Sequence, residues 1–103
     1  MASSFSRMRD PRERARQRAN DAFAYAVELR RDTAWRGNVH EEPRRWLEVA
    51  EAFEVAADAM EEAGWEDRAE HYHSLARAIY EATSRAYEPT LPREVWKRTR
   101  TRR

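Results

Sequence analysis

The residues best suited to chemistry in this chain are three histidines set among many carboxylates. Glu70 and His73 stand three positions apart, the Glu-x-x-His spacing of di-iron helical bundles. Such a centre needs a second Glu-x-x-His, but His40 has no Glu three residues before it. His71 and His73 are two positions apart and diverge by about 200° on a helix. The sequence therefore predicts no metal and no cofactor, and it places His73 beside the core as a polar neighbour.

Other catalytic arrangements are missing from the sequence. It has no cysteine, no glycine-rich phosphate loop and no Gly-x-Ser-x-Gly elbow. We therefore expect a protein that is not an enzyme, with no catalytic residues and no small-molecule substrate. No apolar run approaches the roughly 20 residues of a membrane helix, and the first residues lack the apolar centre of a secretory signal. The expected location is the cytoplasm.

Arginine dominates the basic residues, with 19 Arg against the single Lys97 and a formal net charge of +1. Residues 1–40 carry nine Arg and five acids (+4), residues 41–88 carry five Arg and thirteen acids (−8), and residues 89–103 carry five Arg, one Lys and one Glu (+5). A GC-rich genome enriches Arg and Ala by itself. Guanidinium groups also suit bidentate contacts with phosphate or carboxylate.

The two chain ends hold the strongest functional signal, because clustered arginines attract phosphate backbones and Trp96 could stack on a base. The residues predicted to contact nucleic acid or an acidic partner are Arg93, Trp96, Lys97, Arg98, Arg100, Arg102, Arg103, Arg12 and Arg16. The alternative is that these ends provide solubility or fold back on the acidic middle segment. No base-reading helix is evident, so any nucleic-acid binding should tolerate sequence changes.

The positions of proline, glycine and N-cap residues predict three helices, over residues 11–32, 43–63 and 66–87. Asp10 precedes Pro11 as an N-cap at the first start. Gly37 follows the first helix, and Gly64 suits a left-handed cap after the second. Apolar residues recur at three-and-four spacing and nothing alternates with the period of a strand. We expect an all-α, antiparallel three-helix bundle over residues 11–88, a flexible arm over residues 1–10 and a basic tail over residues 89–103.

The inward positions are mostly alanine, so the helices can approach closely but the core has little volume. We therefore expect some aromatic surface to be buried against a partner, which includes a second copy of the chain. The candidate contacts with a protein partner are Trp46, Trp65, Tyr72 and Tyr80.

The triplet Trp35-Arg36-Gly37 lies between the first two predicted helices. At this chain length it resembles the WXG-type substrates of type VII secretion, which are helical hairpins with Trp-x-Gly in the turn. That resemblance implies an exported hairpin that pairs with a similar partner and has an unbroken second helix. The other interpretation is a plain turn, in which Trp35 covers the end of the core and Gly37 adopts a positive φ.

Together these patterns predict a small helical binding or regulatory protein, from a high-GC bacterium or phage. Its acidic helical face would contact a protein, and its Arg-rich ends would contact nucleic acid or an acidic surface. The WXG-like secreted hairpin is the alternative function.

Overall fold

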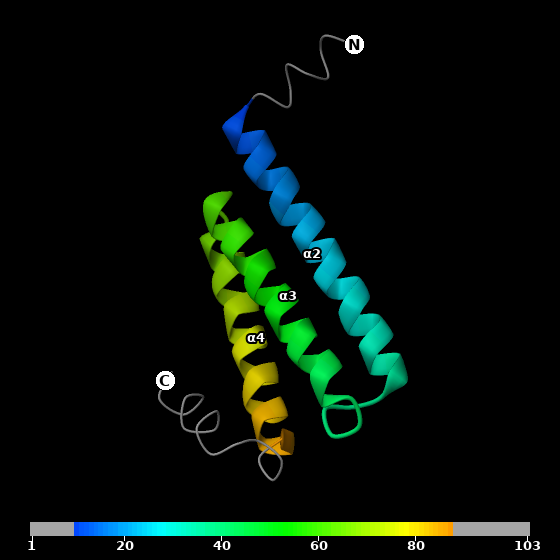
Figure 1. Cartoon of the computed structure of the whole chain (residues 1–103). Helices are drawn as coiled ribbons and strands as arrows, with labels where there is room; N and C mark the ends of the chain where they lie inside the picture. The colour runs from blue at the N-terminus through cyan, green and yellow to red at the C-terminus, as the bar shows by residue number, and fades with distance from the viewer. Residues whose placement is uncertain (1–9, 88–103) are drawn as a thin grey trace.

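The computed structural model describes residues 10–87, which form three helices: α2 (Pro11–Arg36), α3 (Pro43–Glu62) and α4 (Glu66–Tyr87). In the view of Figure 1 they run down, up and down; α3 packs against both neighbours, whereas α2 and α4 touch at few positions. No strand occurs among these residues, so the predicted all-α three-helix bundle is confirmed. Residues 1–9 and 88–103 lie outside the described part, which includes all of the predicted tail over residues 89–103 and all but Asp10 of the predicted arm over residues 1–10. Within residues 10–87, no helix is long and apolar enough to cross a membrane.

Helix α2 begins as predicted, because the Asp10 carboxylate accepts a hydrogen bond from the Arg12 amide at 2.9 Å. It ends four residues later than predicted, at Arg36. Nothing between Asp32 and Arg36 disfavours a helix, and these two side chains pair at 3.2 Å. Thr33 is fully buried, one seven-residue step beyond Ala26, so the inward stripe also continues. The core therefore holds this last turn in helical form.

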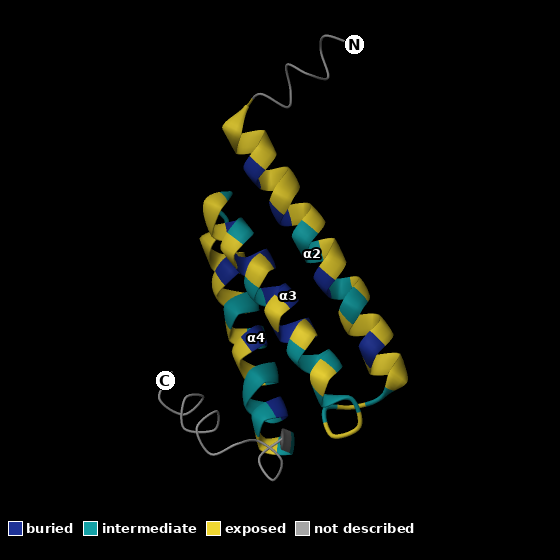
Figure 2. Cartoon of the chain, in the orientation of Figure 1, coloured by how far each residue is buried: buried dark blue, intermediate teal, exposed yellow. Residues whose placement is uncertain are grey.

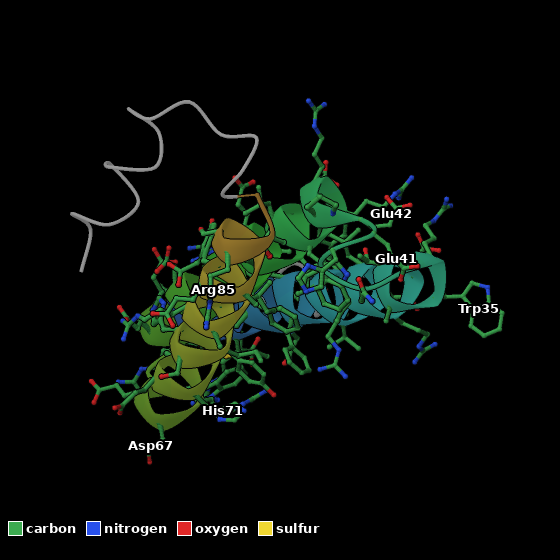
Figure 3. All side chains as sticks on the ribbon, turned by 90° about the horizontal axis from the view of Figure 1, so that it is seen from below. Trp35, Glu41, Glu42, Asp67, His71 and Arg85 are labelled. Carbon is green, nitrogen blue, oxygen red and sulfur yellow. The ribbon has the colours of Figure 1, made fainter. Side chains whose placement is uncertain are left out.

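Trp35 does not cover the end of the core, which corrects that expectation. It lies on the last turn of α2 with 91% of its surface exposed, and Figure 3 shows it projecting into solvent. The added helical turn rotates Trp35 away from the buried stripe that Thr33 occupies.

The α2–α3 turn is closed by reciprocal bonds between Asn38 and Glu41. The Asn38 side chain accepts from the Glu41 amide at 3.0 Å, and the Glu41 carboxylate accepts from the Asn38 amide at 3.0 Å. Gly37 has φ 162°, which is extended backbone, so it does not adopt the positive-φ turn conformation expected of it. A glycine fits there because a Cβ would lie 2.9 Å from the Cβ of Glu41.

The α3–α4 turn confirms the role predicted for Gly64, whose φ is +82. The Gly64 amide donates to the Glu61 carbonyl at 3.0 Å, and the Trp65 amide donates to the Met60 carbonyl at 2.8 Å. This pair of bonds is a Schellman motif. Because the turn separates α3 from α4, the unbroken second helix implied by the WXG resemblance is absent.

The core is built from alanines and a few large side chains, as the inward stripes predicted (Figure 2). One buried cluster centres on Phe53 and Val49, and a second on Met60, beside the α3–α4 turn. Tyr72 joins the three helices: its ring lies 5.0 Å from Phe23 of α2 and 5.8 Å from Phe53 of α3. These aromatic contacts provide much of the bulk that alanine does not.

Candidate functional site

The outward side of the α3–α4 hairpin is strongly acidic. Residues 46–70 contain nine carboxylates and one arginine, Arg68. The outward row of α3 is exposed and consists of Glu48, Glu51, Val55, Asp58 and Glu62. Their spacing of three and four residues follows from the inward stripe, because a helix that buries one side presents the opposite residues to water. We call this surface, together with Glu54 and Glu61, the acidic face.

His73 of α4 lies at one edge of the acidic face. Its Nδ1 is 3.1 Å from Glu54 Oε1 and its Nε2 is 3.1 Å from Glu61 Oε1. Asp58 Oδ1 is 3.5 Å from the same Nε2. The three carboxylates come from positions i, i+4 and i+7 of α3, which form one row on the side that meets α4. A single ring thus links the two helices of the hairpin.

These neighbours favour the charged imidazolium. Both ring nitrogens face carboxylate oxygens, and only the doubly protonated ring can donate from both. The hydrogen bond with Glu54 is the largest cause that raises the pKa of His73 above 6.5; burial opposes it, and the charges of Glu54 and Asp58 and the bond with Glu61 reinforce it. When it is protonated, His73 neutralises part of the carboxylate charge at this edge.

Beside His73, the surface is hollowed into an open depression. Its lining residues are Glu61, Glu66, Glu70, His73, Ser74 and Arg77. Three carboxylates against two basic groups leave the depression acidic even when His73 is charged. Its chemistry suits a cationic side chain of a partner.

Carboxylates and histidine could also suggest a metal, but the arrangement does not fit one. Among the residues that the structure describes, no group of three or more His, Cys, Asp or Glu side chains is arranged to hold an ion. Both nitrogens of His73 already face carboxylates, so neither presents a free lone pair as a ligand.

The aromatics predicted to contact a protein partner have contacts within the bundle. Trp46 donates from its indole N–H to the Gly37 carbonyl at 2.9 Å, and Tyr72 packs between two phenylalanines. Trp65 packs against the second core cluster, with the Arg68 guanidinium over its ring at 4.6 Å. Tyr80 is half-buried on α4. The structure does not gather these four into one exposed patch, and their partner contacts stay predictions.

Two of the residues predicted to contact nucleic acid or an acidic partner are described, Arg12 and Arg16. Both are exposed near the start of α2, where the helix projects past the α3–α4 turn (Figure 1). The other predicted contacts, Arg93, Trp96, Lys97, Arg98, Arg100, Arg102 and Arg103, lie outside the described residues.

Sequence reasoning missed the link between His73 and α3. The helical row of Glu54, Asp58 and Glu61 was visible as a spacing, but it coincided with the outward acids and was assigned to solvent. Only the packing angle of α3 against α4 turns that row toward His73.

Comparisons with protein-family models, with curated proteins and with solved structures found no match to this chain.

Proposed function

We propose that this chain is a small cytoplasmic binding protein, without a catalytic role, whose acidic face docks on a basic surface of a protein partner. The arginines near its two ends contact nucleic acid or a second acidic surface. A regulatory or accessory factor fits this division of charge.

The observation that carries the proposal is the concentration of unpaired carboxylates on the outer side of α3. The side chains of Glu48 and Glu51 are exposed, and their carboxylates have no hydrogen bond or ion pair with any other residue of the 10–87 segment, whereas Glu62 pairs with Arg18 at 3.6 Å. Charges kept unpaired on one side of a small protein repel one another and gain little for its fold. They steer a partner of opposite charge and favour its correct orientation.

The test measures binding of an arginine-rich peptide by calorimetry at low and at physiological salt. The variant Glu48→Gln/Glu51→Gln removes two charges from the acidic face. The matched control, Glu13→Gln/Glu28→Gln, removes two exposed charges from α2. We expect the first variant to weaken binding at least about fivefold at low salt and the control less than about twofold, because screened charges act mainly on the nearest cation.

Equal effects of the two double variants would show that only net charge matters, and the acidic face would lose its role as a docking surface. The contribution of the basic tail is tested separately, by titrating DNA and RNA with the full chain and with a chain that ends at residue 91. Loss of salt-sensitive binding in the shortened chain supports the second half of the proposal.

A further inference from the structure

The side of the bundle opposite α3, where α2 and α4 face each other, has the reverse charge. The α2 row that shares the register of Phe23 consists of Arg12, Arg16, Phe23, Val27 and Arg30. The α4 row beside it consists of Arg68, His71, Leu75, Ala78 and Ala82. The two rows adjoin because Phe23 contacts Tyr72 and lies 5.9 Å from the Arg68 guanidinium. Neither row contains a carboxylate, so these two rows carry positive charge where the outward row of α3 carries negative charge.

Arg68 is the most constrained of these arginines. Its guanidinium lies 4.6 Å from the Trp65 ring and 5.9 Å from the Phe23 ring, and such cation–π contacts hold the group in place. Within residues 10–87, no oxygen accepts a hydrogen bond from it. By contrast, Arg36 pairs with Asp32 and Arg18 with Glu62. The Arg68 N–H donors are thus positioned but unused, which is the state in which a guanidinium binds an oxyanion best.

Two more groups lie near Arg68. Ala19 and Ala69 belong to the same buried cluster, so Arg16, three residues before Ala19, lies close to the level at which α4 begins. His71 is exposed, with its ring 4.8 Å from Tyr72 in an edge-on contact, and Figure 3 shows it on the side of the bundle away from α3. Arginines from two helices and an exposed aromatic ring therefore lie on one surface.

We propose that this α2–α4 face, comprising Arg12, Arg16, Arg68 and His71, binds single-stranded nucleic acid through its phosphate backbone. The Arg68 plane and the His71 ring provide surfaces on which unpaired bases stack, which a closed duplex does not offer. The inference rests on the nucleic-acid half of the proposed function, but it assigns the contact to the helical bundle instead of the basic tail.

The experiment titrates a fluorescein-labelled oligothymidylate strand with the full chain and follows anisotropy at several salt concentrations. The variant is Arg68→Gln and the matched control is Arg44→Gln, an exposed arginine on α3. We expect Arg68→Gln to weaken binding about fivefold or more. The slope of log affinity against log salt concentration should fall by the amount that roughly one phosphate contact contributes. The control should change the affinity less than about twofold. Arg16→Gln gives a second variant, since Arg16 is exposed and outside both core clusters.

Each outcome separates the face from the tail. Binding that is lost with Arg68→Gln and Arg16→Gln but persists when the chain ends at residue 91 supports the α2–α4 face. If both substitutions leave the affinity unchanged and removal of the tail abolishes binding, this inference is overturned and the proposed function stands. No binding by any chain overturns this inference and the nucleic-acid half of the proposed function, and leaves the docking role of the acidic face standing. Equal affinity for a blunt duplex of the same length overturns the assignment to single strands.

Discussion

His73 Nδ1 lies 3.1 Å from Glu54 Oε1, although 19 residues separate them in the chain. The contact crosses from α4 to α3 and is matched on the other side of the ring by Glu61. The side chain of His73 is only 24% exposed, and Glu54 is 41% exposed. The pair therefore couples the protonation of one imidazole to the packing of the hairpin that carries the acidic face.

The first prediction concerns pH. The folded pKa of His73 is raised above its ordinary value of 6.5, so the stabilisation is fully present below pH 6.5 and is lost as the pH rises through the folded pKa. We expect the free energy of unfolding to fall over this interval and His73→Gln to remove much of the fall. Urea unfolding at a series of pH values measures this.

His71→Gln is the control for the pH experiment, because His71 is exposed and contacts no carboxylate in the described chain. It should leave the pH dependence unchanged. A His73 titration by NMR with a midpoint at or below 6.5 would contradict the imidazolium contact directly.

The second prediction concerns two buried threonines. The hydroxyl of Thr33 is buried without a hydrogen-bond partner in the described structure, whereas that of Thr83 donates to the Ile79 carbonyl at 2.7 Å. Thr33→Val keeps the shape and removes an unpaired polar group, so it should stabilise the fold by about 1 kcal/mol. Thr83→Val should give no gain, because it also removes a hydrogen bond. The denaturant midpoints of the two variants, compared with that of the unsubstituted protein, measure both changes in stability. An equal shift in the two variants would contradict the claim that only the Thr33 hydroxyl lacks a hydrogen-bond partner.

The third prediction concerns the α3–α4 turn. Gly64 has φ +82, and a Cβ there would meet nothing within 4 Å, so any cost of substitution comes from the backbone alone. Gly64→Ala should lower the free energy of unfolding by about 1 kcal/mol, and Gly64→Asn by less, since asparagine tolerates the left-handed region better. Thermal unfolding measures both. A Gly64→Ala variant more stable than Gly64→Asn would contradict the explanation that the left-handed backbone conformation sets the cost.

The fourth prediction distinguishes the two tryptophans at the other end of the bundle. Trp46→Phe removes the indole hydrogen bond to the Gly37 carbonyl and should cost about 1 kcal/mol. Trp35→Phe should change stability by less than about 0.5 kcal/mol, because that ring is exposed. Chemical unfolding of both proteins gives the comparison. A larger loss of stability for Trp35→Phe than for Trp46→Phe would mean that the Trp35 ring makes a contact that the structure does not have.

The fold could be predicted because its signals are local. Pro11, Pro43 and Gly64 mark helix ends through their own backbone preferences, and the alanine stripes reveal the inward side of each helix. The end of α2 was misjudged because Thr33 and Trp35 carry no strong local preference. Burial of Thr33 against the other helices decides that this turn stays helical and that Trp35 faces water.

The sequence by itself determined the segregation of charge along the chain, the three helices and the faces that they bury. It could not determine which outward rows meet, because that depends on how each helix rotates and tilts against its neighbours. The tertiary structure decided that His73 lies against Glu54 and Glu61, and that Arg68 rests on Trp65 and Phe23 without a carboxylate. The contacts of His73 with the two carboxylates and of Arg68 with Phe23 join residues from different helices, so helix packing, and not chain proximity, sets those distances.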